Sequence, residues 1–264
     1  MSDQAHNVRA AGHKGEKEEL IAGRQAVLEA LRSGKPMLIK MAEGIKGPIV
    51  NEIKLLARHK KIPVEHLSRT AFQDEAGKIS GNQGVAALVA PFQYNSLTEL
   101  VSISRSSKED PLLIMLDHVE DPHNLGAVMR TADAAGVHGL IIPNKRAAGV
   151  TASVRKVAAG AAERIPVALV SNLIQAVEVL KKEGFWLYGA EGDGEEVFYR
   201  VDYRRPLVLV IGSEGKGLSR LMRQNCDLIL SIPMPGAESG SLNVSAAAAV
   251  LIYAALGQRM GWST

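Results

Sequence analysis

Three segments of this 264-residue chain combine glycine with polar and charged side chains, each directly after or at the end of a stretch that is predicted to be a strand. They are residues 121–130 (DPHNLGAVMR), 210–218 (VIGSEGKGL) and 232–245 (IPMPGAESGSLNVS). Parallel α/β sheets bind ligands at the carboxyl ends of their strands. We therefore expect these segments to meet at one edge of a sheet and to form a binding or catalytic site.

The first and third segments also admit a purely structural explanation. Asp121 or Asn124 could cap the helix after the first segment, and Ser241 or Asn243 could cap the helix after the third. Asn124 and Arg130 are six residues apart, so we expect them to reach the same end of the sheet only if Asn124 lies in the loop. The third segment has two prolines and two glycines and is longer than a connection requires, which favours a ligand.

The second segment has three glycines within six residues, which would let the backbone approach a ligand closely. It is not a phosphate-binding loop, because Lys216 is followed by Gly217 instead of Ser or Thr. The dinucleotide-binding pattern is excluded as well, because the order of the glycines is reversed. Ser213 lacks the flanking glycines of a nucleophile elbow. A glycine-rich turn without a ligand remains the alternative.

No metal site is expected. The chain has one cysteine, Cys226, and its seven histidines are scattered without a His-x-x-x-His pair. A single thiol also excludes a disulfide framework and is typical of a protein from a reducing compartment, so we expect a cytoplasmic location.

Taken in order, the three segments resemble the motifs of one family. The matching residues are Asn124-x-Gly-Ala-x-x-Arg130, then Ile-Gly-Ser-Glu-Gly-x-Gly at 211–217, and then Ile-Pro-Met at 232–234 with Ser-Leu-Asn-Val-Ser at 241–245. This pattern is similar to the SpoU/TrmH branch of the SPOUT RNA 2′-O-ribose methyltransferases. Residues 154–163 are also similar to the family, and residues 18–92 resemble its N-terminal RNA substrate-binding domain.

The resemblance implies an α/β fold with a mostly parallel sheet and a deep C-terminal trefoil knot. It also implies S-adenosylmethionine (SAM) as cofactor, a homodimer, and an RNA substrate. With both domains present, the most similar subgroup methylates a guanosine ribose in large-subunit rRNA. The loop 234–241 is about one residue longer than in the family, so nothing is inferred for residues 238–240.

The resemblance further implies roles for individual residues. Arg130 would contact the RNA, and because guanidinium keeps its proton we expect it to clamp a phosphate instead of acting as a base. The other expected catalytic residues are Asn124, Glu214, Ser241 and Asn243. The expected cofactor-binding residues are Gly212, Ile232, Met234 and Leu242. The expected RNA-binding residues are Arg130, Arg155, Lys156 and Arg24, for which a solvated helix face is the alternative.

Other functions remain open at this point. Within the family, the substrate could be tRNA, or the chain could be a ribosomal antibiotic-resistance methylase. A non-catalytic RNA-binding protein that assists ribosome assembly is a second class. A nucleotide-binding dehydrogenase is disfavoured, because residues 123–126 offer only one glycine after the first strand of the sheet.

The elements that must position these residues follow from the hydrophobic pattern. We divide the chain into a disordered leader at 1–19, a small α/β domain at 20–93, a Ser-rich linker at 94–110 with a possible helical turn at 97–104, and a catalytic domain at 111–264. In the last part we expect strands at 112–116, 139–142, 166–170, 186–189, 207–211 and 228–232. Helices are expected at 125–135, 152–162, 172–182, 219–224 and 242–256, the last of them buried on all sides.

Composition narrows the function classes. Aromatic residues make up only 4% of the chain, which argues against readers of RNA that stack bases on exposed rings. There is no run of 18 apolar residues, so no membrane-spanning helix is expected. The net charge of +3 lies entirely in the first 110 residues, which is weak support for a nucleic-acid partner.

Overall fold

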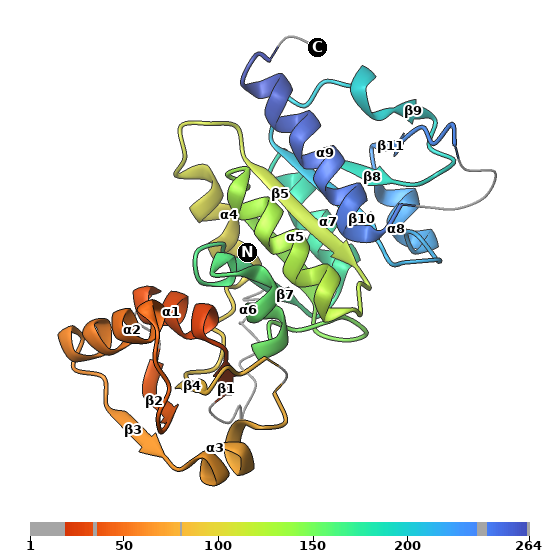
Figure 1. The fold of residues 1–264 in the computed structure, drawn as a ribbon. Coiled ribbons are helices and arrows are strands. Elements are labelled where there is room, and N and C mark those ends of the chain that lie inside the picture. The colour runs from red at the N-terminus through yellow and green to blue at the C-terminus, as the bar shows by residue number, and fades with distance from the viewer. Residues whose placement is uncertain (1–18, 34–35, 80, 237–241, 263–264) are drawn as a thin grey trace.

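The computed structural model describes residues 19–33, 36–79, 81–236 and 242–262. The described chain forms a small N-terminal α/β domain and a larger domain with a parallel sheet, which lie next to each other in Figure 1. The expected α/β class, with a mostly parallel sheet and a small N-terminal domain, is confirmed. Ser241 lies outside the described residues, as do residues 1–18 of the expected leader.

The N-terminal domain has a four-stranded mixed sheet in the order β1-β4-β2-β3. Its strands are β1 (Glu19–Ala22), β2 (Pro36–Ala42), β3 (Val64–Leu67) and β4 (Val85–Val89), and its helices are α1 (Arg24–Ser33), α2 (Pro48–His59) and α3 (Arg69–Ala76). β4 pairs antiparallel with both β1 and β2. Glu19 therefore belongs to the first strand and not to the leader.

The larger domain has a seven-stranded sheet in the order β7-β6-β5-β10-β8-β11-β9, and all its paired strands are parallel. The strands are β5 (Leu112–Asp117), β6 (Gly139–Pro143), β7 (Val167–Val170), β8 (Trp186–Ala190), β9 (Glu196–Val197), β10 (Leu207–Gly212) and β11 (Leu228–Ser231). The central strands β5 and β10 are buried along their whole length, which explains their continuous apolar sequences.

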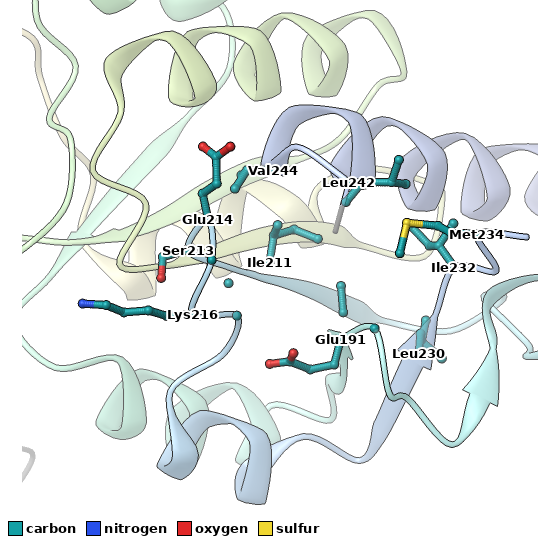
Figure 2. Close-up of a pocket in the computed structure, with 16 residues that line it drawn as sticks. Glu191, Ile211, Ser213, Glu214, Lys216, Leu230, Ile232, Met234, Leu242 and Val244 are labelled. Carbon is teal, nitrogen blue, oxygen red and sulfur yellow. The ribbon is translucent and has the colours of Figure 1, made fainter. Parts of the chain in front are cut away.

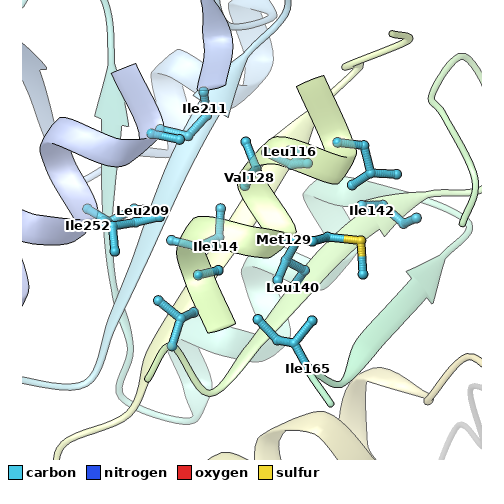
Figure 3. Packing of buried hydrophobic residues seen from close by; sticks show 14 of the residues in the cluster. Ile114, Leu116, Val128, Met129, Leu140, Ile142, Ile165, Leu209, Ile211 and Ile252 are labelled. Carbon is cyan, nitrogen blue, oxygen red and sulfur yellow. The ribbon is translucent and has the colours of Figure 1, made fainter. Parts of the chain in front are cut away.

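Helices cover both faces of this sheet. One face packs against α5 (Pro122–Ala134), α6 (Ala152–Ala158) and α9 (Val244–Arg259), and the other against α4 (Leu97–Arg105), α7 (Leu173–Lys182) and α8 (Arg220–Asn225). Short 3₁₀ turns follow α6 at Ala161–Glu163 and β9 at Phe198–Arg200. Figure 3 shows Val128 and Met129 of α5 among the aliphatic side chains of β5 and β6. Burial of each such side chain contributes about 1.5–3 kcal/mol.

The segment 94–110 is not an extended linker over its length. It contains α4, which begins with a capping box in which Ser96 and Glu99 exchange hydrogen bonds. The bond from the Ser96 backbone N–H, at 2.7 Å, lowers the pKa of Glu99. Leu97, Leu100 and Val101 are buried against the sheet of the larger domain. α4 is thus a structural part of that domain.

The two domains meet between β1 and α6. The Arg155 side chain is only 5% exposed, and its guanidinium lies 3.7 Å from Glu19 and 3.8 Å from Glu163. It also donates to the Ala90 carbonyl at 3.3 Å and stacks over the Phe92 ring. The expectation that Arg155 contacts RNA is therefore corrected, because the side chain is enclosed by the domain junction.

The C-terminal helix α9 differs from the expectation as well. Val244, Ala248, Leu251, Ile252 and Ala255 are buried, but the opposite side of the helix is only partly covered in a single chain, with Ala246 and Tyr253 exposed. On that side Tyr253 is 43% exposed. The uniformly apolar sequence of α9 therefore has only one of its faces packed in the core.

Cys226 ends α8 and packs against the core on the α4, α7 and α8 side of the sheet. Its Sγ would lie 2.9 Å from a Cβ placed on Gly189. Burial, reinforced by the charge of Asp227, raises the pKa of the thiol to about 12.

Among the described residues no helix is long and apolar enough to cross a bilayer.

Candidate active site

The carboxyl ends of β8, β10 and β11 surround a hollow of about 250 Å³. Its wall comes from the residues that follow each of these strands and from the start of α9: 190–192, 211–217, 230, 232, 234, 242, 244 and 247. The expected cofactor residues Gly212, Ile232, Met234 and Leu242 all line it. In Figure 2 the last three gather on one side, whereas the Lys216 side chain extends away from them.

The glycines of the second segment shape this wall. Ser213 and Gly217 exchange backbone hydrogen bonds of 3.0 and 2.9 Å, which close a tight loop. A Cβ on Gly212 would lie 2.1 Å from the Gly217 carbonyl carbon, so the loop can close only if residue 212 is glycine. Gly215 and Gly217 have φ values of 75° and 64°, which glycine adopts without strain. The loop therefore presents backbone groups to the hollow.

Glu191 fastens the same loop from the neighbouring strand. Its Oε1 accepts the Leu218 backbone N–H at 2.5 Å, directly after the loop. Figure 2 shows Glu191 below the loop and Glu214 above it, beside Val244. Two carboxylates thus border the first hollow, which suits a positively charged ligand.

A second hollow of about 550 Å³ adjoins the first. The two share five residues, namely 213, 214, 216, 217 and 244. The rest of its wall follows β5, β6 and β10: residues 117–121, 124, 146, 218 and 219. A ligand in the first hollow would therefore be separated from the second hollow only by the loop 213–217 and the start of α9.

Asn124 and Glu214 meet across this second hollow. Asn124 is 5% exposed, and its Nδ2 donates to Glu214 Oε2 at 3.5 Å, a long hydrogen bond. Asn124 lies in the first turn of α5 and not in the loop, because Asp121 caps the helix through the His123 backbone N–H at 2.9 Å. The condition under which Asn124 and Arg130 were expected to reach the same end of the sheet is therefore not met.

Arg130 does not join the other residues within one chain. It is exposed on α5 and lines neither hollow. Arg130 is six residues after Asn124, which places it about 9 Å along the helix axis and about 120° around it. The expected orientation of Arg130 by Asn124 is thus not seen in the single chain.

The remaining expected site residues lie in different parts of the structure. Asn243 caps α9, where its Oδ1 accepts from the Ser245 backbone at 2.9 Å and from the Ser245 hydroxyl at 2.6 Å, and it does not line either hollow. Arg24 begins α1 and donates from its Nε to the Gln83 carbonyl at 3.4 Å. Lys156 is exposed, with its Nζ close to Gly81 of the N-terminal domain.

Sequence reasoning missed several ionisable side chains that line the hollows, among them Asp117, His118, Arg146 and Glu191. A signal for each was available, because Asp117 ends β5 and His118 follows it, Arg146 lies in the loop after β6, and Glu191 follows β8. The carboxyl-end rule applies to every parallel strand, including those without a glycine-rich pattern. In the described parts of the chain, no group of three or more His, Cys, Asp or Glu residues could hold a metal ion.

Comparison with known proteins identifies the family. Residues 111–253 match the SpoU rRNA Methylase family, and residues 20–95 match the domain family described as RNA 2′-O ribose methyltransferase substrate binding. The chain belongs to the SpoU rRNA methylase family. The resemblance inferred from the three motifs is confirmed, and the chain is an RNA methyltransferase of the SpoU/TrmH type.

Individual relatives of this SpoU methylase agree. YacO of Bacillus subtilis, a protein assigned to the TrmH family of tRNA/rRNA methyltransferases, is 41% identical over 90% of this chain and 95% of its own. The SpoU methyltransferase AviRb from Streptomyces viridochromogenes, solved in complex with AdoMet, aligns with a TM-score of 0.76 at 28% identity over 92% of this chain and 91% of that one. The A. aeolicus TrmH/SpoU tRNA modifying enzyme aligns with 62% of this chain and 83% of that one, at 32% identity and a TM-score of 0.52.

Proposed function

We propose that this SpoU methylase transfers a methyl group from SAM to the ribose 2′-hydroxyl of a guanosine in large-subunit rRNA. The observation that carries the proposal is the meeting of residues 211–217, 232, 234 and 242 around one hollow, next to the pair Asn124 and Glu214. These residues come from all three motifs. A relative with the same fold, AviRb, binds AdoMet.

The first hollow fits a SAM molecule in its chemistry. Ile211, Leu230, Ile232 and Met234 offer an apolar surface for an adenine ring, and the closely approaching backbone at Gly212 and Gly217 offers hydrogen-bonding groups. The carboxylates of Glu191 and Glu214 suit a ligand that carries a sulfonium and an ammonium charge. When bound, SAM supplies an electrophilic methyl group, so no metal is needed for activation.

The protein must then bring a ribose to the second hollow and hold it in line. Asn124 and Glu214 offer an amide and a carboxylate that can hydrogen-bond to ribose hydroxyls. Arg130 is proposed to clamp a phosphate of the RNA, because a guanidinium pairs with phosphate through two parallel hydrogen bonds. Ser241 and Asn243 are proposed to hold the ribose and the end of the cofactor site. Accurate positioning of this kind can lower a barrier by about 7–11 kcal/mol in the best cases.

A homodimer is proposed to complete this site. The partly covered side of α9 is apolar, and α9 packs beside α5, which carries Arg130 (Figure 1). A second copy that docks on this side of α9 would cover Tyr253. It would also bring Arg130, the proposed phosphate clamp, together with the two hollows. Tyr253→Glu would place a charge in the interface, so sedimentation should show a shift from dimer to monomer.

We also propose the trefoil knot that the family resemblance implies for the C-terminal part.

RNA is proposed to bind across both domains, with Arg24 and Lys156 as phosphate contacts. Both lie near the turn at residues 81–84, where the N-terminal domain faces α6. Binding of an rRNA fragment should weaken steeply as salt increases, because phosphate neutralisation releases counterions. Affinity that does not depend on salt would contradict these contacts. An RNA substrate implies a cytoplasmic location.

The direct test is transfer of a tritium-labelled methyl group from SAM to separate pools of rRNA and tRNA, followed by mapping of ribose methylation. Label in a guanosine 2′-O position of large-subunit rRNA is the expected result. Label only in tRNA would support the tRNA methyltransferase instead. RNA binding without transfer to either pool would support a non-catalytic assembly protein and would overturn the proposal.

A further inference from the structure

His118 occupies an unusual place directly after β5. Its backbone φ is 60°, in the left-handed region that a side chain with a Cβ rarely adopts. Such a conformation costs about 1–3 kcal/mol and persists where the surrounding structure enforces it, often at functional sites. Here the strained residue lines the second hollow, together with Asn124 and Glu214.

The imidazole of His118 is held by the residue before it. Its Nδ1 lies 2.5 Å from Oδ1 of Asp117, whose side chain is 1% exposed. The other oxygen of Asp117, Oδ2, accepts the Ser219 backbone N–H at 2.7 Å. The carboxylate is thus fixed from two sides, and it orients the ring through Nδ1. Because the His118 side chain is 40% exposed, Nε2 is the nitrogen that remains for a ligand.

The charges around His118 come from several elements. Glu120 and Asp121 follow it in the same loop, Arg146 reaches the hollow from the loop after β6, and Glu214 and Lys216 reach it from the loop after β10. Three carboxylates and two cations therefore line the same hollow as the histidine, besides Asp117. The second hollow is separated from the first only by the loop 213–217, so an RNA ribose here would lie close to the methyl donor.

We propose that His118 is the catalytic residue that accepts the proton of the ribose 2′-hydroxyl, with Asp117 as its positioning residue. This inference rests on the proposed methyl transfer. The 2′-oxygen forms its new bond to the methyl carbon while the carbon–sulfur bond breaks. The sulfur keeps the electron pair and leaves as a neutral thioether, and the hydroxyl proton moves to Nε2 of His118, from which water removes it. Imidazole is the side chain that most often serves as a general base in enzymes, whereas an arginine keeps its proton in proteins.

The first test compares His118→Gln with His59→Gln, a matched change at an exposed histidine of α2 in the N-terminal domain. Single-turnover rates of RNA methylation are measured against pH, with SAM binding measured by calorimetry. For His118→Gln we expect a rate about 10²–10⁴-fold lower, unchanged SAM affinity, and loss of the fall in rate on the acid side that histidine protonation causes in the wild type. His59→Gln should behave as the wild type. An unchanged rate and pH profile in His118→Gln would overturn the role of His118.

A second test needs no turnover. In protein labelled with ¹⁵N-histidine, NMR reports which ring nitrogen of His118 carries the proton in the neutral form. We expect the Nδ1-protonated tautomer, hydrogen-bonded to Asp117, and a shift towards the other tautomer in Asp117→Asn. A neutral ring protonated on Nε2 in the wild type would overturn the proposal, because no lone pair would face the hollow. His118→Gly serves as a folding control, since glycine accepts a φ of 60° without strain.

The two proposals fail in different ways. If the wild type transfers no methyl group to any RNA, the proposed function is wrong and the role of His118 falls with it. If the wild type methylates a ribose while His118→Gln is equally fast at every pH, only the role of His118 is wrong.

Discussion

Arg130 is the residue whose place in the fold differs most from its expected role. It is exposed on α5, outside both hollows, and the described residues offer it no hydrogen bond or ion pair. Because the exposed Arg130 side chain makes no such contact, its removal should not disturb the packing of the protein. A change in activity can then be attributed to the lost guanidinium.

We predict that Arg130→Ala lowers methyl transfer by about 100-fold or more, the cost of a misplaced reacting group. SAM affinity, measured by calorimetry, should remain within experimental error of the wild type. Arg130→Lys should recover little of the activity, because an ammonium group cannot bind phosphate in two parallel bonds. Arg58→Ala, at an exposed position of α2, is the matched control. Loss of SAM binding in Arg130→Ala would show that the residue serves the cofactor site instead.

His138 gives a prediction about stability and pH. Burial and the nearby charge of Arg259 lower the pKa of His138, and its Nδ1 accepts the Leu112 backbone N–H at 3.1 Å. The unfolded chain therefore binds the proton more readily than the folded one. This histidine contributes stability that is fully present above its unfolded pKa and is lost as the pH falls through the folded value.

In His138→Asn, the side-chain oxygen can accept the same hydrogen bond but cannot be protonated. We expect urea unfolding to show a smaller loss of stability between pH 7.5 and pH 5 for this variant than for the wild type. Parallel curves for the two proteins would show that His138 has no part in acid sensitivity.

At the scale of elements, the first motif, residues 124–130, also contributes to helix packing. Gly126 of α5 faces α6, and a Cβ at this position would lie 2.6 Å from Cβ and 2.9 Å from Cγ1 of Val157. It would also lie 2.9 Å from the Val154 carbonyl oxygen. The glycine thus lets the two helices approach closely, and this contact holds the first turn of α5, with Asn124, next to Glu214.

We predict that Gly126→Ala destabilises the protein by about 1–3 kcal/mol, although alanine is the better helix former by about 1 kcal/mol. The reason is the overlap with Val157. Combining Gly126→Ala with Val157→Gly removes both Cβ and Cγ1 of residue 157, so the double variant should be less destabilised than the sum of the two single changes. Thermal or urea unfolding of all four proteins gives this coupling. Strict additivity would mean that the clash is relieved elsewhere.

The strands of the large domain could be predicted from the sequence almost residue for residue. Buried parallel strands are continuous apolar runs, as in β5 and β10, and such runs are readily distinguished from loops. The pattern failed where few side chains are buried. α3 has only Phe72 and Ala76 in its core, and β9 is a two-residue strand. The start of β1 was missed because its partner, β4, is more than sixty residues away in the chain.

The candidate site was more predictable in its glycine and apolar parts than in its charged ones, of which Glu214 was expected and His118, Arg146 and Glu191 were not. Gly212, Ile232, Met234 and Leu242 line one hollow, as the motif order implied. Arg155 was assigned to RNA because a charged residue on a helix is usually exposed, and the sequence does not show that β1 and Phe92 cover it. His118 belongs to none of the motifs, and the role proposed for it rests on contacts and a backbone conformation that only the structure reveals.

For the whole molecule, the junction around Arg155 determines how the two domains are held together. Its guanidinium lies between carboxylates of both domains, and the Glu163 side chain is only 6% exposed. Removal of one partner from a buried ion pair costs about 3–5 kcal/mol. We predict that Arg155→Ala lowers the melting temperature and increases the maximum dimension in small-angle X-ray scattering.

Arg204→Ala is the matched control for this change, because Arg204 is exposed and pairs with Asp202 of the same, larger domain. Its scattering profile should match the wild type, and its loss of stability should be small. If Arg155→Ala keeps both the melting temperature and the compact profile, the two domains are held by other contacts.

The single thiol of the chain, Cys226, is half-buried at the end of α8, and its raised pKa disfavours the reactive thiolate. Reagents that label cysteines need an accessible thiolate, so the native Cys226 should stay unlabelled while the protein is folded. One new cysteine on each domain could therefore carry a fluorescent dye without background. Energy transfer between the dyes would then follow the two domains in real time as RNA arrives and departs.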